Sequence, residues 1–170
     1  MDFLELASSR FSARKFSSRM VEEDKLINIL SAGRVAPTAK NNQPQQVYVL
    51  QSKDNLERIN KVSPCIYGAS TVLMVCSNTD ICWSSEDKLY SSAEMDASIV
   101  CTHMMLEAKD LGIDSCWVLR FDRILAKELF NLPKNIEPFC LLPIGYSEEN
   151  CEPNDRHFDR KQLQDTVVRL

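Results

Sequence analysis

Ser91–Gly112, with the sequence SSAEMDASIVCTHMMLEAKDLG, is the longest apolar segment of this 170-residue chain. Ser91 followed by Glu94 is a capping-box pattern, and Gly112 stands where glycine is common, just beyond the C-terminal end of a helix. The spacing therefore predicts one helix across the segment. Its apolar residues form two neighbouring stripes, one of Met95, Ile99 and Leu106 and one of Val100, Met104, Ala108 and Leu111.

The apolar surface of this helix is wider than packing on one side requires. No residue from 97 to 106 carries a formal charge. A helix that is apolar almost all round is a central helix, and pattern alone favours packing inside the core of the chain. The alternative is that a second subunit supplies one of its neighbours. Ser98, Thr102 and His103 interrupt the run, which is too short and too mixed to span a membrane.

The composition argues against several classes of protein. The net charge of −4 does not favour general binding to nucleic acids or to anionic membranes. The N-terminus lacks the apolar segment of a signal peptide and the seven cysteines are an odd number, so we expect reduced thiols in the cytoplasm. No two cysteines have C-x2-C spacing and there are only two histidines, which predicts no metal site. The length and the lack of a boundary predict one domain over residues 1–170.

Strands and shorter helices are expected around the central helix. Apolar runs predict strands at Gln46–Gln51, Thr71–Ser77, Ile113–Leu119 and Phe139–Tyr146. Amphipathic or capped segments predict helices at 2–8, Glu22–Ala32, Asp54–Val62 and Arg123–Phe130. Gly33 is expected to end the second of these helices, and Pro143 suggests that the last strand is an edge strand or carries a bulge. Strands separated by helices indicate a layered fold with one sheet.

A basic, hydroxyl-rich segment lies near the N-terminus. Alternation places Arg10, Ser12 and Arg14 on one side if this segment is extended. Two guanidinium groups that flank a hydroxyl suit a phosphate or another anion, and the alternative is a solvated basic turn. The C-terminal tail carries a second basic cluster, and the two clusters could close on one phosphate. This second cluster consists of Arg156, His157, Arg160 and Lys161.

Residues 36–45, APTAKNNQPQ, form a loop with two prolines and three consecutive amide side chains. Asn and Gln side chains offer donors and an acceptor, so they can bind the polar edge of a heterocycle. The alternative is a turn-rich connector. The chain has no GxGxxG and no GxxxxGK[ST], so neither a Rossmann site nor a P-loop is indicated. What remains suits a cofactor that brings its own chemistry and needs only to be positioned by the protein.

Taken in order, these features resemble the nitroreductase family of flavoproteins. The resemblance implies an α+β fold with a central, mostly antiparallel sheet flanked by helices, bound FMN, and a homodimer with two sites at the interface. His103 would then lie at the interface. The chain departs from the family at Gln45, where Trp is usual, and residues 78–90 would be what remains of an insertion over the substrate pocket. The motifs are Arg10–Phe16 (RFSARKF), Ala36–Pro44 (APTAKNNQP), Asp96–Gly112, Cys116–Val118 with Phe121–Asp122, and Ile144–Tyr146 with Arg160–Lys161.

The resemblance also implies how the chain would hold the flavin phosphate. Arg10 and Ser12 would bind it together with Arg160 and Lys161. Arg14 would lie at the pyrimidine end of the ring, where a cation stabilises the negative charge of reduced flavin.

The flavin ring would be contacted by two further segments. Pro37, Thr38 and Asn41 would reach it from the partner subunit. Backbone groups near Leu119 and Arg120 would lie against the ring, one of them donating to N5. Small residues are common at these last two positions in the family, so Arg120 could project a charge toward the site or the dimer interface.

The implied reaction is the transfer of a hydride from NAD(P)H to flavin N5 and then to an electron-poor acceptor, such as a nitroarene, a quinone or an activated alkene. No side chain would act as a catalytic nucleophile. One alternative is a non-catalytic flavin carrier or sensor on the same fold. Another is a flavin-free thiol enzyme that uses Cys65 or Cys82.

Overall fold

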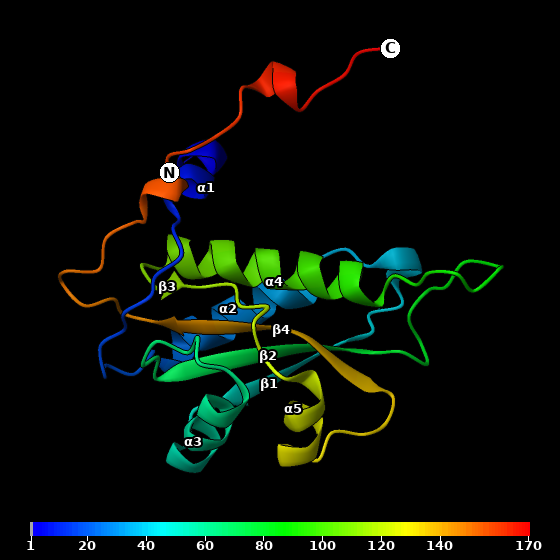
Figure 1. Ribbon diagram of the computed structural model, residues 1–170, viewed down its shortest axis with the longest axis horizontal. Coiled ribbons are helices and arrows are strands. Elements are labelled where there is room, and N and C mark those ends of the chain that lie inside the picture. Colours follow the sequence, from blue (N-terminus) through cyan, green and yellow to red (C-terminus); the bar gives the residue numbers. More distant parts are fainter. Residues whose placement is uncertain (1) are drawn as a thin grey trace.

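The computed structural model describes residues 2–170, and its centre is a four-stranded antiparallel sheet with helices on both faces (Figure 1). The strand order is β1-β2-β4-β3, and the neighbouring strands pair in the antiparallel sense. The expected α+β architecture with a mostly antiparallel sheet is therefore confirmed. The strands are β1 (Gln45–Leu50), β2 (Thr71–Asn78), β3 (Asp114–Ser115) and β4 (Ile136–Gly145).

Each face of the sheet is covered by its own pair of helices (Figure 1). Helices α2 and α4 cover one face, and α3 and α5 cover the other. Along β2 the side chains alternate between two hydrophobic clusters: Leu73 packs with α2 and α4, whereas Met74 packs on the side of α3 and α5. This explains why β2 is apolar throughout, as the sequence predicted. The helices are α1 (Phe3–Ser9), α2 (Glu23–Val35), α3 (Lys53–Val62), α4 (Ala93–Asp110) and α5 (Arg123–Leu129).

Helix α4 is the predicted central helix. Its C-terminal end is as predicted, and its N-terminal end is not. At the C-terminal end Gly112 has φ +73°, and the Ile113 N–H donates to the carbonyl of Ala108 at 2.8 Å, which is a Schellman arrangement. At the N-terminal end the predicted capping box is wrong. The N-cap is Ser92, whose side chain makes no capping bond, while Ser91 pairs with a residue of the preceding loop.

Only one of the two apolar stripes of α4 is buried. Met104 and Ala108 are fully buried, and they pack with residues of α2 and of the sheet. Met95 and Ile99 on the other stripe are 51% and 37% exposed. Helix α4 therefore packs within the core of the chain, as pattern alone favoured, and it also presents an uncovered apolar side.

Gly33 lies inside α2 and does not end it, so that expectation is wrong. A Cβ at this position would lie 2.8 Å from Cγ of Met104, which means that the glycine allows α2 to approach α4 closely. The helix instead ends at Val35 because Ala36 precedes Pro37 and has extended dihedral angles.

Strand β3 is much shorter than the predicted strand over residues 113–119. Only Asp114 and Ser115 form a ladder with β4. Pro143 does not mark an edge, because β4 lies between β2 and β3. It does not mark a bulge either, because the irregularity in the pairing of β2 with β4 lies at the step from Val75 to Cys76. The carbonyl of Pro143 accepts from the Cys116 N–H at 3.1 Å, so the proline nitrogen also faces the side of β3. The longer ladder between β2 and β4 therefore loses no donor.

Three further observations apply to residues 2–170. No helix in this part of the chain is long and apolar enough to cross a bilayer. All seven cysteines are free, and no group of three or more His, Cys, Asp or Glu side chains is arranged to hold a metal ion.

Candidate functional site

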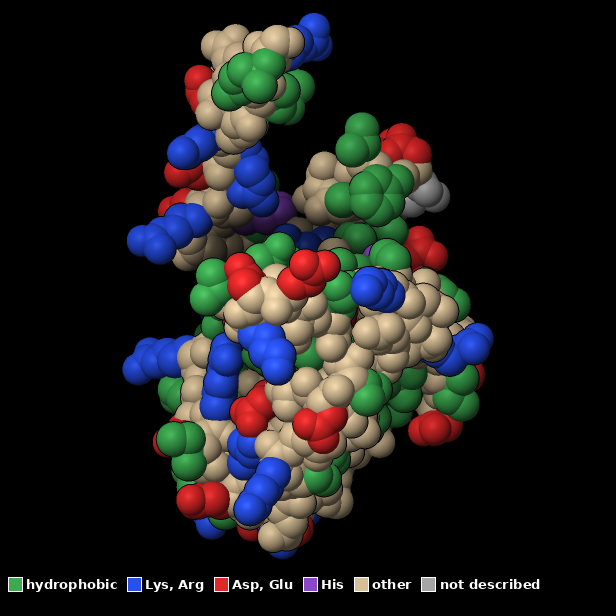
Figure 2. Space-filling view, turned by 90° about the vertical axis from the view of Figure 1, so that its right-hand side faces the viewer, with side chains coloured by type: hydrophobic (Ala, Val, Ile, Leu, Met, Phe, Trp, Pro, Cys, Tyr) green, Lys and Arg blue, Asp and Glu red, His purple; other side chains and the backbone are tan. Residues whose placement is uncertain are grey.

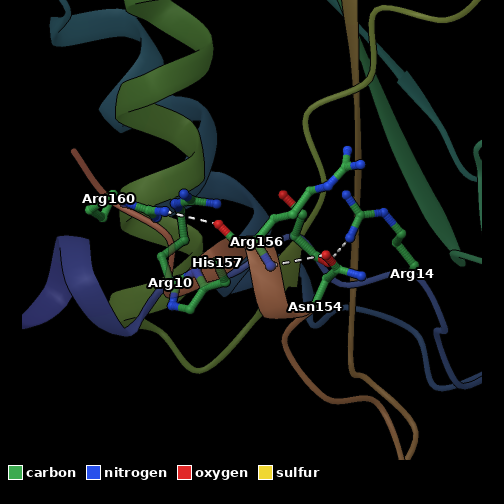
Figure 3. A pocket seen from close by; sticks show the side chains of 7 residues that line it. Arg10, Arg14, Asn154, Arg156, His157 and Arg160 are labelled. Carbon is green, nitrogen blue, oxygen red and sulfur yellow. Dashed lines mark hydrogen bonds between the residues drawn. The ribbon is translucent and has the colours of Figure 1, made fainter.

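A basic hollow of about 510 Å³ lies where the N-terminal segment meets the C-terminal tail (Figure 3). The two basic clusters that the sequence singled out therefore meet, although they lie at opposite ends of the chain. Figure 2 shows the tail and the N-terminal helix on either side of the hollow, with basic side chains at its floor. Lys161 does not line it. The lining residues are Arg10, Ser12, Arg14, Asn154, Arg156, His157 and Arg160.

The N-terminal side of the hollow is an extended segment fixed by backbone hydrogen bonds. The Ala13 N–H donates to the carbonyl of Ser115 at 3.0 Å, and the Phe16 N–H donates to the carbonyl of Tyr67 at 3.1 Å. Ala13 and Phe16 are buried in the core. Because alternate side chains of an extended segment point to opposite sides, the buried Ala13 leaves its neighbours Ser12 and Arg14 at the hollow.

The C-terminal side of the hollow is a short 3-10 turn, Asp155–His157, with Asn154 as its N-cap. The side chain of Asn154 accepts from the Arg156 N–H at 3.1 Å. Nη1 of Arg160 donates to the carbonyl of Arg156 at 3.2 Å, so this guanidinium is positioned by the turn itself. Asn154 was not among the predicted site residues, although an Asn before a short turn is a typical capping signal.

The hollow concentrates positive charge. Burial lowers the pKa of Arg10, and the neighbouring charge of Arg160 lowers it further. Among residues 2–170, no ion pair includes an arginine that lines the hollow. Guanidinium groups that repel one another and lack a carboxylate partner are stabilised by a bound anion. Bidentate donors with a hydroxyl nearby fit a phosphate monoester, so the residues present fit the phosphate group of FMN.

The amide-rich loop lies elsewhere, at the N-terminal end of α4. The Ala39 N–H donates to Oδ1 of Asp96 at 2.9 Å, and the Gln43 N–H donates to the hydroxyl of Thr38 at 3.0 Å. Pro37 and Asn41 are exposed. These predicted flavin contacts are thus held close to the first turn of α4.

The basic hollow lies at the opposite end of the same helix. Nζ of Lys109, in the last turn of α4, lies 5.7 Å from the ring centroid of Phe11. Asp96 and Lys109 are separated by thirteen residues, which span about 20 Å of α-helix. Within one chain, therefore, Pro37, Thr38 and Asn41 do not meet Arg10, Ser12 and Arg14.

Leu119 and Arg120 lie on an exposed segment that follows β3. Leu119 is 62% exposed, and the carbonyl of Arg120 accepts from the hydroxyl of Ser63 at 2.7 Å. The backbone N–H groups of both residues have no hydrogen-bond acceptor within residues 2–170. Ser115, which pairs with Ser12, lies four residues before Leu119, a distance of about 13 Å in an extended chain. An elongated ligand anchored at the hollow could therefore follow this segment toward the two free donors.

Comparisons with known proteins show which family the chain belongs to. The profile of the Nitroreductase family matches residues 7–65 and 63–146. A curated protein of Methanothermobacter thermautotrophicus, provisionally named as an NADH dehydrogenase/NAD(P)H nitroreductase, is 32% identical over 157 residues that cover 88% of this chain and 80% of its own.

Solved structures give the same match. A nitroreductase family protein of Clostridium difficile 630 has a TM-score of 0.93 and 38% identity, covering 99% of this chain and 98% of its own. A protein of Clostridium difficile R20291, described as an FMN-dependent nitroreductase, has a TM-score of 0.78 and 23% identity, again covering 99% and 98%. At this identity the second structure shows that the fold is shared and no more.

Proposed function

The chain belongs to the nitroreductase family, and from that premise we propose that it is an FMN-dependent oxidoreductase that uses NAD(P)H to reduce an electron-poor acceptor, such as a nitroarene, a quinone or an activated alkene. The observation that carries this proposal is the basic hollow, whose arginines lack carboxylate partners among residues 2–170. When bound, FMN supplies the chemistry, because its ring accepts and donates a hydride. The protein then has to bind, orient and electrostatically tune the cofactor.

In this proposal Arg10, Ser12 and Arg160 bind the FMN phosphate. Two guanidinium groups and a hydroxyl offer the planar and compact donors that a phosphate accepts. The pKa of Arg10, lowered by burial and by Arg160, supports this role because a dianion between the two groups would relieve their repulsion. Lys161 is exposed outside the lining, so we assign it a supporting electrostatic role.

Arg14 is the proposed cation at the pyrimidine end of the flavin ring. Its Nη1 lies 3.3 Å from the carbonyl oxygen of Ser12, which directs the guanidinium along the wall of the hollow. A fixed positive charge stabilises the negative charge that reduction places on this end of the ring. Leu119 and Arg120 would contribute backbone N–H donors, and both of these donors are free in the described chain.

Pro37, Thr38 and Asn41 require a second subunit in this proposal, because they lie about 20 Å from the hollow along α4. We therefore propose a homodimer with two sites. The exposed side of α4 supports this proposal, because Met95 and Ile99 leave an apolar surface uncovered. His103 lies on the same helix, and its Nδ1 is 2.9 Å from the carbonyl oxygen of Ile99.

The C-terminal tail provides a second indication of a partner. Beyond the hollow it extends away from the body of the chain (Figure 1). It exposes several large apolar side chains, which are unfavourable in water unless another surface covers them. They include Phe158, Leu163 and Val168, at 72%, 76% and 83% exposure.

The proposal is tested with the full chain, purified and reconstituted with FMN. We expect a yellow protein whose flavin absorbance bleaches with NADH or NADPH under anaerobic conditions and returns on adding a nitroarene or a quinone. A protein that fails to bind FMN would refute the proposal. A protein that binds FMN but is neither reduced by nicotinamide nor reoxidised by any acceptor would instead be a flavin carrier or sensor on the same fold.

A further inference from the structure

The loop at the N-terminal end of α4 has an unusual backbone conformation. Lys40, Asn41 and Gln43 have φ values of +53°, +56° and +50°. Side-chain-bearing residues rarely adopt this left-handed region, and among these three only Asn does so readily. A loop with three such residues within four positions persists only where the surrounding structure fixes it.

Asp96 is the group that fixes this loop to α4. Its Oδ1 accepts from the Ala39 N–H at 2.9 Å, and its Oδ2 accepts from the hydroxyl of Ser92 at 2.6 Å. Asp96 is 2% exposed, and it is the only carboxylate so enclosed among residues 2–170. Burying a carboxylate is costly unless charge-assisted hydrogen bonds compensate, so both bonds are needed to keep this side chain in place.

The same carboxylate also connects the loop to the segment over residues 78–92. The hydroxyl of Ser92 accepts from the Trp83 N–H at 3.1 Å, and the side chain of Asn42 donates to the carbonyl of Ile81 at 2.9 Å. Asp96 thus stands at the meeting point of three parts of the chain: the 38–43 loop, the 78–92 segment and the first turn of α4.

We propose that Asp96 is a positioning residue of the flavin site, which holds the 38–43 loop in its left-handed conformation so that Thr38 and Asn41 can contact the flavin bound by the partner subunit. This inference rests on the proposed function, because it assumes that the loop faces FMN. A carboxylate suits the position because two donors converge on it. An Asn there would turn its NH2 group toward one of those donors, so that only one of the two hydrogen bonds would keep its geometry.

The test compares Asp96→Asn with Asp110→Asn, the same substitution at an exposed carboxylate in the last turn of the same helix. Two quantities are measured for each variant and for the unaltered protein: the Kd for FMN, from flavin fluorescence quenching by the apoprotein, and the hydrogen-exchange rates of the Ala39 and Gln43 amides in the apoprotein. For Asp96→Asn we expect the Kd to rise about tenfold, which corresponds to ~1.4 kcal/mol, and both amides to exchange faster. For Asp110→Asn we expect both quantities to stay within about twofold.

The outcomes separate this inference from the proposed function. If the unaltered protein binds FMN and Asp96→Asn binds it equally well, Asp96 is not a positioning residue and the proposed function stands. A weaker Kd with unchanged exchange at residues 38–43 also overturns the inference, because the effect would not act through the loop. If the unaltered protein does not bind FMN, both fail together.

A second variant covers the case in which Asp96→Asn does not fold. Ser92→Ala removes one of the two hydrogen bonds to Asp96 and leaves the carboxylate bonded to Ala39. We expect a smaller change in the same direction, a rise of about threefold in the FMN Kd with faster exchange at Ala39. An unchanged Kd and unchanged exchange in this variant would overturn the inference.

Discussion

Replacing Arg10 by Ala should weaken the binding of FMN without lowering the stability of the apoprotein. Arg10 is half-buried beside Arg160, and burial together with that neighbouring charge lowers its pKa. In the apoprotein the two guanidinium groups repel each other without a compensating anion. Removing one of them relieves this repulsion, so the apoprotein should be at least as stable as before. With FMN present, the same substitution removes a charge-assisted contact to the phosphate.

The size of the affinity loss follows from that contact. A hydrogen bond to a charged group contributes ~1.5–3 kcal/mol, which corresponds to a Kd for FMN that is about 10 to 150 times higher. The backbone of Arg10 closes α1 through its N–H bond to the carbonyl of Leu6, and an alanine keeps this bond. The loss should therefore come from the side chain alone.

The assay is flavin fluorescence quenching by apoprotein, with thermal unfolding of the same apoprotein as the second readout. Arg58→Ala is the matched control, because Arg58 pairs with Asp54 on α3, away from the hollow, and its removal should leave the Kd for FMN unchanged. An Arg10→Ala variant that binds FMN with full affinity would refute the assignment. So would a weaker Kd accompanied by an apoprotein that melts several degrees lower, since the loss would then reflect general destabilisation.

Four further predictions concern the site and the fold. Arg14→Ala should lower the two-electron potential of bound FMN by about 30 mV, equivalent to ~1.4 kcal/mol, as measured by equilibration with redox dyes, and an unchanged potential would contradict its role. Gly33→Val should destabilise the apoprotein by ~2 kcal/mol in urea unfolding, because its side chain would overlap the facing methionine of α4, and a neutral result would show that the two helices can separate without cost. Hydrogen bonds from the Tyr146 hydroxyl and from a neighbouring arginine lower the pKa of Glu22 from 4.5 to about 2. Because the pKa is lower in the folded state, the ionised Glu22 stabilises the fold above pH 4.5. The difference in melting temperature between the unaltered protein and Glu22→Gln should therefore disappear as the pH falls from 4.5 to 2. Ile99→Glu should give a monomer in light scattering at micromolar concentration and lose FMN, whereas a dimer with full flavin would exclude the exposed side of α4 as the interface.

Much of the fold could be predicted because the apolar patterns are local. Strand β2 was predicted to within one residue at its C-terminal end, since a continuous apolar run between turns is typical of a strand buried on both faces. The predicted strand at residues 113–119 was too long, because an apolar run indicates burial and carries no information on which residues form ladder bonds. The prediction that Gly33 ends its helix was wrong for a related reason. A glycine near the end of a helical pattern can either stop the helix or allow another element to approach closely. The close neighbour is Met104, which lies 71 residues away in the chain.

The candidate site was predictable where its chemistry is concentrated in short segments. Arg10, Ser12 and Arg14 alternate in one segment, so their common side could be read from the spacing. Asp96 was different, because nothing in its local sequence distinguishes a buried carboxylate from an ordinary acidic residue in the first turn of a helix. Its role depends on Ala39, 57 residues earlier in the chain, and therefore on the tertiary structure.

The length of α4 explains why the proposed site needs two copies of the chain. The loop at residues 38–43 and the basic hollow lie at opposite ends of this helix, about 20 Å apart. If two copies pack through the exposed sides of α4 around a two-fold axis perpendicular to the helix, their α4 helices run antiparallel. The N-terminal end of each helix then lies beside the C-terminal end of the other, so each hollow meets the partner's 38–43 loop. A parallel arrangement would keep the two halves apart, which makes the antiparallel pairing the geometry that the proposed flavin site requires.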